Sequence, residues 1–423
     1  MKSILKIMVA VFTITLISTG FSAVENVKVG GDIAIYGILR GDYYIDEGNE
    51  DLHFFQTHAR VYVSADLSDN VSTMIRIINE RDWGTEDYYS YNNYYYYDRE
   101  IDLDLAYIKV TDLLAPGLIL TVGRQEIELG EGLVVGSRFN AYAYDDTVLI
   151  AARDLGLRKA FDAIRLDYSA TTAPLNLTAF YSKIYEAFID DQGEKTLYGL
   201  NIGTKVAEIL NLDVYYVRRA IDSVSEDTLD TAGIRIVSGV PAVEGLTLKG
   251  EYAKQFGDNG TNDYDGSALL LGAEYKFAAN MEPKIKVNYV LLTGDDNPAG
   301  DIESWQMVYP SNIGSRIGPL LYAYSAYNNL SSLSSESNLQ VINLGFSIKP
   351  VEKLSISLDG YLTELDEGTP NDIGTEISFS IDYAYTEDLS FGLTLGKILA
   401  DDVIEYYGGD DAWQAIASMK VSF

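Results

Sequence analysis

Cysteine is absent from the 423-residue sequence, and histidine is nearly so. Without cysteine the chain forms neither a disulfide scaffold nor a thiolate metal site. The two histidines, His53 and His58, are five residues apart in a segment with the pattern of a strand, so their side chains face opposite sides. A Ser–His catalytic arrangement would have to use one of them. We therefore expect a protein that is not an enzyme.

Basic residues are also scarce. The sequence has 31 Lys and Arg against 63 Asp and Glu, which gives a formal net charge of −32. Phosphate binding needs a basic surface, so nucleic acid is excluded as a partner. The charge of the whole chain does not decide the charge of an interior surface, because the acids gather in long connecting segments.

Long apolar runs are confined to the start of the chain. Residues 1–23, MKSILKIMVAVFTITLISTGFSA, begin with Lys2 and Lys6, continue through an apolar stretch and end in small residues. This is the pattern of a secretory signal peptide, and it is too short for a spanning helix. We expect cleavage to leave residues 24–423; an uncleaved anchor is the alternative. No later segment approaches about 18 consecutive apolar residues, so no transmembrane helix is predicted there.

Alternation of apolar and polar residues fills the rest of the sequence. In AWQAIASMKVSF, residues 412–423, the apolar positions from Trp413 to Phe423 share one parity, and Ile416 is the exception on the other. A period of two indicates a β-strand with two different faces. Eighteen segments of about 10 to 14 residues show it, long enough to cross a bilayer at a tilt. They are 27–40, 55–67, 71–80, 101–110, 117–129, 161–170, 175–184, 196–206, 210–220, 228–239, 244–256, 265–278, 284–294, 338–349, 353–364, 374–385, 389–399 and 412–423.

The connections between these segments alternate in length. Tight ones such as 68–70 and 112–117 follow the even segments, and long acidic ones such as 81–100 and 295–337 follow the odd segments. All nine prolines fall in connections, as expected if the segments pair in a sheet. The pattern predicts an all-β transmembrane antiparallel β-barrel of about 18 strands over residues 24–423, in the outer membrane of a Gram-negative cell. A soluble β-sandwich is the alternative.

The aromatic end of the chain fits this barrel. Phe423 has the parity of the lipid-facing side and falls where aromatic girdles lie. A terminal strand that ends in phenylalanine resembles the assembly signal of bacterial outer-membrane proteins. The expected partners are therefore outer-membrane lipid, lipopolysaccharide and the barrel-assembly machinery.

Basic residues recur on the polar face of the segments. The predicted pore-lining residues are Arg60, Arg76, Arg124, Arg165, Arg235, Lys249, Glu126 and Glu128. Rings of Arg and Lys line anion-selective pores, which predicts a constriction that favours anions. The alternative is that these cations pair with lumen acids across strands and brace the wall.

Two stretches carry a family resemblance. GRQEIELGEGLVVGSR, residues 123–138, followed by FDAIRLDY, residues 161–168, resembles the alginate-export porin family. A later stretch at 293–310, TGDDNPAGDIESWQMVYP, looks like that family's late external loop, with Gly294, Asp295, Trp305 and Pro310. The matching motif residues of the first two stretches are Gly123, Arg124, Gln125, Gly130, Glu131, Gly132, Phe161, Asp162 and Arg165.

The resemblance implies an eighteen-stranded outer-membrane channel with a cation-lined constriction. Its solutes would be small anions or an anionic polysaccharide such as an alginate-like chain. A general or cation-selective porin and a structural or adhesive barrel without transport are the alternatives. No cofactor is expected, although Asp295 and Asp296 could bind Ca²⁺ through carboxylate oxygens.

Overall fold

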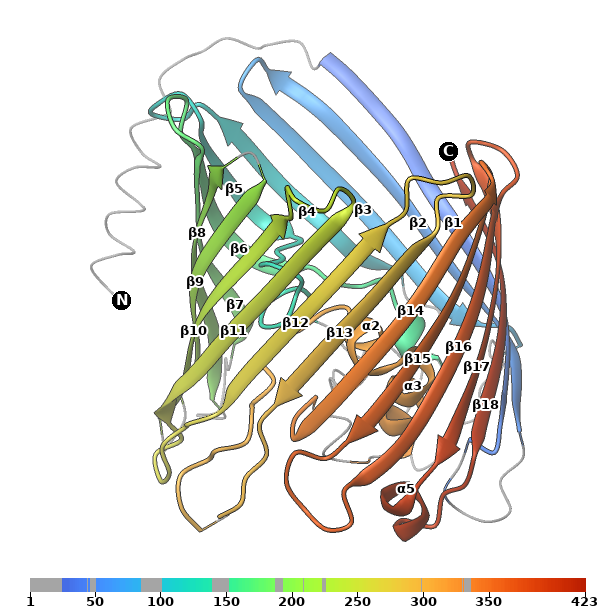
Figure 1. Ribbon diagram of the computed structural model, residues 1–423. Coiled ribbons are helices and arrows are strands. Elements are labelled where there is room, and N and C mark those ends of the chain that lie inside the picture. Colours follow the sequence, from blue (N-terminus) through green and yellow to red (C-terminus); the bar gives the residue numbers. More distant parts are fainter. Residues whose placement is uncertain are drawn as a thin grey trace.

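Among the residues described by the computed structural model, eighteen antiparallel strands close into one barrel (Figure 1). The structure describes residues 25–43, 45, 51–84, 101–138, 152–186, 193–207, 209–222, 226–297, 299–328, 330 and 336–423. The expected signal peptide, residues 1–23, lies outside these ranges. No helix of the described part is long and apolar enough to cross a membrane.

Every predicted segment overlaps one strand, so the predicted fold class is confirmed. The strands are β1 (Glu25–Gly41), β2 (Leu52–Ser68), β3 (Val71–Asp82), β4 (Asp102–Thr111), β5 (Leu118–Gln125), β6 (Phe161–Ser169), β7 (Leu175–Tyr185), β8 (Glu194–Ala207), β9 (Leu210–Asp222), β10 (Asp227–Gly239), β11 (Leu246–Asp258), β12 (Ser267–Lys276), β13 (Lys284–Leu292), β14 (Leu339–Val351), β15 (Leu354–Glu364), β16 (Asp372–Ala384), β17 (Leu389–Ala400) and β18 (Ala412–Ser422). The helices are η1 (Arg153–Leu155), α2 (Ile313–Ile317), α3 (Pro319–Asn328) and α5 (Asp402–Tyr406).

The barrel has two unlike ends. Strands that follow one another in the chain are neighbours in the sheet, and β1 pairs with β18, so no strand edge is left open. Tight connections such as 69–70 lie at one end, here called the short-turn end. Long connections such as 293–338 lie at the other, the long-loop end, at the bottom of Figure 1.

The outer face of the wall is apolar, as a lipid-facing sheet requires. On alternate positions of the strands, side chains such as Val214, Ile234 and Leu344 are 45%, 41% and 51% exposed. Exposure of this kind on every second residue follows from the pleat, which turns successive side chains to opposite faces. The lipid therefore contacts one parity of each strand, and the other parity faces the interior.

Ion pairs interrupt the apolar outer face near the long-loop end. Arg218 of β9 lies opposite Asp230 of β10, and its Nε and Nη2 donate to the two carboxylate oxygens at 2.6 and 2.7 Å. Lys183 and Glu194 pair in the same way at the base of the β7–β8 connection. Both pairs have the parity of the apolar outer residues, so they lie at the outer margin of the lipid-facing band.

The chain end closes the barrel. The pairing of β1 with β18 runs from Gly41 opposite Trp413 to Asp32 opposite Ser422. Beyond it, Gly31 and Phe423 exchange two backbone hydrogen bonds of 2.9 and 3.0 Å. A Cβ on Gly31 would lie 2.4 Å from the carbonyl oxygen of Arg60 and 2.9 Å from the Phe423 ring, so the glycine makes room for the neighbouring strand and for the terminal side chain.

Deleting Phe423 is expected to lower the fraction of protein that reaches the folded, heat-modifiable form. The deletion removes both closing hydrogen bonds and the terminal ring, whereas Phe423→Tyr keeps both and serves as the control. Electrophoresis of unheated membranes measures the folded fraction. Equal folding of the deletion variant and the wild type would contradict an assembly role for this residue.

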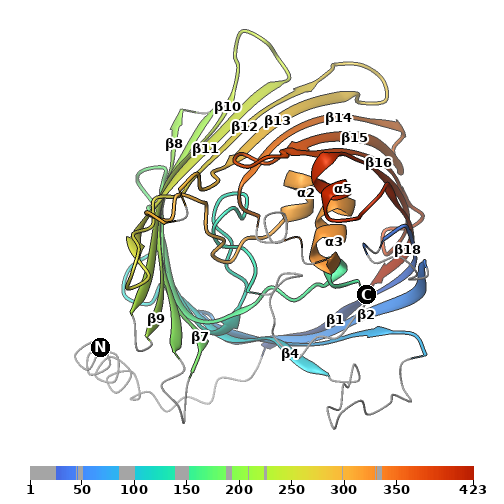
Figure 2. The same cartoon turned by 90° about the horizontal axis from the view of Figure 1, so that it is seen from below.

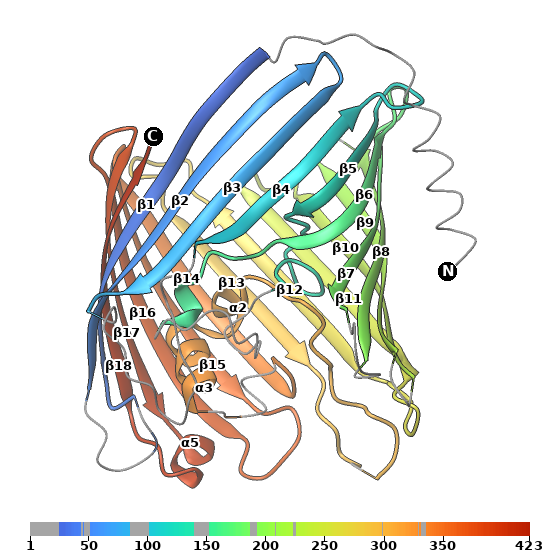
Figure 3. The same ribbon diagram turned by 180° about the vertical axis from the view of Figure 1, so that it is seen from behind.

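The interior holds two connections that fold inward from the long-loop end. We call the described residues 126–138 and 152–160 the first inner loop, and the described residues between 293 and 338 the second inner loop. Figure 2 shows α2 and α3 of the second inner loop inside the ring of strands. The first inner loop leaves the wall after β5, which has 8 residues and is the shortest described strand (Figure 3).

Apolar side chains hold the second inner loop against the wall. Trp305, Ile317 and Leu320 are almost completely buried, as is Tyr324 on α3. Burying side chains of this size stabilises a loop by roughly 1.5–3 kcal/mol each. The inner loops are therefore packed parts of the structure, and they determine the free cross-section of the channel.

Candidate pore constriction

The two inner loops are joined to each other. Val135 and Tyr309 form a parallel bridge, and the amide of Gly136 donates to the carbonyl of Tyr309 at 2.8 Å. The amide of Ser311 donates to the carbonyl of Gly132 at 2.8 Å. These backbone contacts fix the turn at residues 130–132 in the middle of the barrel.

Two glycines shape that turn. Gly130 and Gly132 have φ values of +60° and +75°, in the left-handed region that favours glycine. A Cβ on Gly132 would also lie 2.0 Å from the hydroxyl oxygen of Ser311. The Gly–acid–Gly motif therefore serves a tight turn and a close approach of the two inner loops, and it presents Glu131 to the facing wall.

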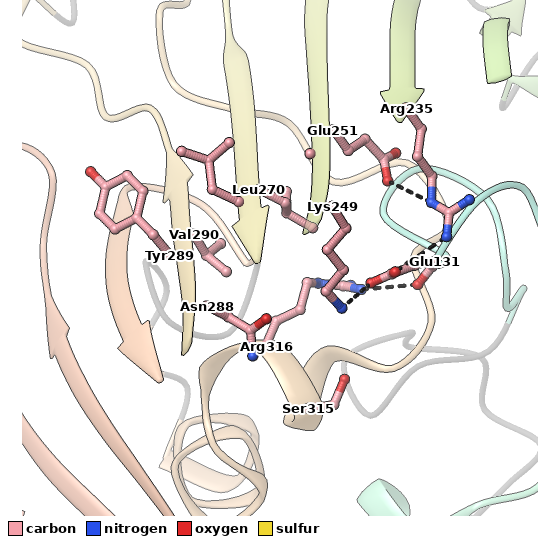
Figure 4. Close-up of a pocket in the computed structure, with 12 residues that line it drawn as sticks. Glu131, Arg235, Lys249, Glu251, Leu270, Asn288, Tyr289, Val290, Ser315 and Arg316 are labelled. Atoms are coloured by element: carbon pink, nitrogen blue, oxygen red, sulfur yellow. Dashed lines mark hydrogen bonds and ion pairs between the residues drawn. The ribbon is translucent and has the colours of Figure 1, made fainter. Parts of the chain in front are cut away.

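Glu131 lies among three basic side chains (Figure 4). Nζ of Lys249 on β11 donates to Oε2 of Glu131 at 2.9 Å, and Nη2 of Arg235 on β10 donates to Oε1 at 3.2 Å. Arg316 of α2 approaches the backbone carbonyl of Glu131 at 3.4 Å. Burial alone would raise the pKa of Glu131, but the hydrogen bonds and charges of Lys249 and Arg235 hold that pKa below its usual value.

Acids balance the basic residues of this cluster. Arg235 also contacts Asp213 at 3.2 Å and Glu251 at 4.0 Å. Arg316 forms an ion pair of 2.5 Å with the fully buried carboxylate of Glu336. Three basic side chains thus contact four acidic ones. Among the described residues, Glu131 is the acid that pairs with Lys249.

The far end of the first inner loop is fastened to the opposite wall. Asp154 of η1 forms a two-oxygen contact with Arg40 of β1, at 2.6 and 3.1 Å. Arg158 contacts Glu80 of β3 at 2.9 Å and also pairs with Asp102 of β4. The first inner loop therefore connects the β10–β11 wall with the β1–β4 wall and narrows the interior between them.

A wall carboxylate holds the second inner loop. Glu376 of β16 accepts hydrogen bonds from the first two amides of α3 that follow Pro319, those of Leu320 at 3.1 Å and Leu321 at 2.8 Å. The first turn of a helix has unpaired amides that a carboxylate satisfies. This contact places α3 beside β16 and β17, on one side of the channel.

Most of the predicted pore-lining residues face the interior, but they do not form one ring. Arg60 pairs with Asp32 at 3.0 Å, and Arg165 pairs with Asp167 at 2.8 Å. Arg76 contacts both Asp104 and Glu126 at 2.5 Å. These residues belong to the β1–β6 side of the wall, away from the Arg235–Lys249 pair that Glu131 brings together.

The predicted lumen position of Arg124 is wrong. On β5, Thr121 and Gln125 face the interior, and Arg124 has the opposite parity, so its side chain faces outward. Its cross-strand neighbours are Ala106 on β4 and Asp162 on β6. Its guanidinium donates to Asp162 at 3.0 Å on the outer face. A charged pair persists there because β5 ends one residue later, at the margin of the lipid.

Glu126 and Glu128 lie beyond the end of β5, not within a strand as predicted. The chain turns inward after Gln125, whose side-chain amide donates to the carbonyls of Thr121, Gly123 and Ala163. Glu128 accepts a hydrogen bond of 2.8 Å from the hydroxyl of Ser311. Both acids therefore belong to the first inner loop, and Glu128 helps to join the loops.

The possible calcium ligands stay a prediction. Asp295 accepts a hydrogen bond from the amide of Asn297 at 2.9 Å, in a local turn. The neighbouring charge of Asp296 raises the pKa of the Glu303 carboxyl. Within the described ranges no three metal-ligating side chains gather in one place.

The sequence pattern predicted an external loop over 295–337, whereas α2 and α3 of this segment lie inside the barrel. A signal was present, because IGSRIGPLLYAYSAY, residues 313–327, is too apolar for a loop in water. The partners of Glu131 had no such signal. Arg235 and Lys249 are 104 and 118 residues away in the sequence.

Comparison with known proteins identifies the family. A family model described as alginate export matches residues 42–378, and no curated protein matches the chain. Solved structures with this fold include two proteins of Pseudomonas aeruginosa. OccK3 (OpdO) is 12% identical with a TM-score of 0.61, covering 95% of this chain and 97% of that one. OccK8 (OprE) is 12% identical with a TM-score of 0.62, covering 96% and 100%. The chain belongs to the alginate-export family, and it is a porin-like channel of the cell outer membrane.

Proposed function

We propose that this channel passes hydrophilic solutes that carry carboxylates, including acidic polysaccharide chains of the alginate kind. The observation that carries the proposal is the position of Glu131. Its carboxylate is held by Lys249 at 2.9 Å and Arg235 at 3.2 Å in the interior of the barrel. Side chains that bind the protein's own carboxylate have the chemistry to bind that of a solute.

The surroundings of Glu131 support exchange with a solute. The side chains of Lys249 and Glu131 are 40% and 37% exposed, so the pair is reached by water. A pocket of about 70 Å³ adjoins them, and its lining includes Asn288 and Ser315, which offer neutral hydrogen bonds (Figure 4). An exposed ion pair in water is worth about 1 kcal/mol or less, so a passing carboxylate can replace Glu131.

A general or cation-selective porin is the second candidate. The ion pairs of Arg60, Arg76 and Arg165 favour it, because each cation is matched by an acid on the wall. A structural or adhesive barrel would differ from both by showing no conductance in a planar bilayer. The proposed partners in the membrane are lipid, lipopolysaccharide and the assembly machinery, as the terminal strand also suggests.

Lys249→Gln is expected to lower the anion preference about twofold, because it removes one of the two cations that hold Glu131. The measurement is the reversal potential across a planar bilayer in a salt gradient. Lys254→Gln is the matched control, since Lys254 lies on the same strand but pairs with Asp265 on the outer side. A wild-type channel that prefers cations, with no shift in Lys249→Gln, would overturn the proposal.

A further inference from the structure

A larger hollow lies on the inner wall, away from the constriction. It has a volume of about 520 Å³ and extends along β4 to β7, from the short-turn end to the start of the first inner loop. Cavities of roughly 300–1,000 Å³ are typical of small-molecule sites. Its lining includes Tyr107, Lys109, Thr121, Arg165, Asn176 and Thr178.

Two cations share one row of this hollow. Lys109 of β4 lies opposite Thr121 of β5, and Thr121 lies opposite Arg165 of β6. Lys109 and Arg165 are thus two strand spacings apart, about 10 Å. Arg165 pairs with Asp167 at 2.8 Å, whereas Lys109 has no ion-pair partner in the described part of the chain.

The acids of the hollow are already engaged. Asp167 accepts from Arg165 and, at 2.7 Å, from the hydroxyl of Thr178. Glu126 accepts from Arg76 at 2.5 Å. Among the described residues of the hollow, the ammonium of Lys109 is therefore the charge without an ion-pair partner, and an anionic ligand would complement it.

Neutral groups complete the site. Asn176 accepts a hydrogen bond from Ser169 at 2.9 Å through its carbonyl oxygen, which leaves its amide hydrogens for a ligand. Tyr107 lies two residues before Lys109 on the same inward parity, and it presents an aromatic ring beside the cation. An ammonium, an amide and an aromatic ring together suit a sugar that carries a carboxylate.

We propose that this hollow is a second binding site, which holds one short acidic-sugar segment between the short-turn end and the constriction. Lys109 binds the carboxylate, Asn176 donates to a sugar hydroxyl, and Tyr107 packs against the ring. The inference rests on the proposed function, because it places a carboxylate-bearing solute in this channel. It adds a site that the solute occupies outside the Glu131 cluster.

Calorimetric titration of the folded, detergent-solubilised channel with digalacturonate tests the site. Lys109→Gln is expected to weaken binding about fivefold, as expected for loss of one solvent-accessible charge contact. Lys205→Gln is the matched control, because Lys205 has the same inward parity near the short-turn end of β8 but lies outside the hollow. The Lys205→Gln variant should bind digalacturonate with the affinity of the wild type. Maltose, a neutral disaccharide, should bind neither the wild type nor the variants.

The outcomes separate this site from the proposed function. Unchanged affinity in Lys109→Gln, or equal binding of maltose, would overturn the second site. If the second site fails this test but Lys249→Gln shifts the reversal potential, the proposal for the constriction stands alone. Loss of binding in Lys109→Gln with an unshifted reversal potential in that variant supports a site distinct from the constriction.

Discussion

Replacing Glu131 by Gln should raise the preference of the channel for anions about fivefold. The substitution keeps the size of the side chain and removes the carboxylate that neutralises Arg235 and Lys249. A charge at contact distance in water-filled surroundings is worth about 1 kcal/mol, or about fivefold in a permeability ratio. The reversal potential in a salt gradient measures the change. High salt is the better condition, since external acids are then screened over about 3 Å.

Glu126→Gln is the control for Glu131→Gln. It removes one acid from the same inner loop, but that acid contacts Arg76 on the other wall. We expect a smaller shift there, because Asp104 still pairs with Arg76. Equal shifts in the two variants would mean that selectivity depends on total charge and not on the Glu131 contact.

Protonation of Glu131 should change the ion selectivity in the same direction as Glu131→Gln, and this should occur only at low pH. The pKa of Glu131 lies below its usual value, so the carboxylate is ionised at neutral pH and loses its charge only in more acidic solution than an ordinary glutamate does. The contribution of the ion pairs is complete there and is lost as the pH falls through the lowered pKa. The difference between wild type and Glu131→Gln should therefore be constant near neutral pH and shrink as the pH falls through the lowered pKa of Glu131.

Arg158→Ala is expected to loosen the first inner loop and to destabilise the barrel by about 3–5 kcal/mol. The reason is that it leaves the fully buried carboxylate of Glu80 without its cation. Asp102 loses its partner as well. Single-channel recordings should show larger and noisier conductance, because the segment between the two walls loses an anchor. Thermal unfolding followed by electrophoretic mobility measures the loss of stability.

Arg60→Ala is the matched control for Arg158→Ala. Arg60 and Asp32 are 22% and 28% exposed, so water solvates the remaining acid. A pair of this kind contributes about 1 kcal/mol or less. Quiet conductance and wild-type stability in Arg158→Ala would show that Arg40 and Asp154 alone hold the loop.

The wall of the barrel was predictable because each strand that faces lipid on one side and water on the other must alternate apolar and polar residues. A segment such as 412–423 shows its two faces within its own sequence, and its parity survives in β18. The in-turned end of β5 was not predictable in this way. The sequence around Gln125 does not mark it as the last residue of the strand. The strand ends there because the Gln125 side chain donates hydrogen bonds to carbonyls on β5 and β6, and the contact to β6 forms only in the folded sheet.

The constriction depends on contacts between distant parts of the chain. The resemblance to alginate-export porins pointed to Gly130, Glu131 and Gly132, but the partners of Glu131 follow only from the folded loop. Arg124 shows the opposite error. Arg124 was assigned to the interior with the polar parity of Glu126 and Glu128, but in β5 the inward parity is that of Gln125, so Arg124 faces outward.

The ion pair of Arg218 and Asp230 also sets the thickness of membrane that the barrel fits. On β9 the outward residues from Leu210 to Tyr216 precede it, and the pair lies eight residues from the start of the strand. At about 3.3 Å per residue and a tilt of about 40°, this gives an apolar height of about 20 Å. Thicker bilayers would have to thin around β9 and β10, at a cost of fractions of a kcal/mol per ångström. The protein is therefore matched to a thin hydrocarbon layer, such as that of a bacterial outer membrane.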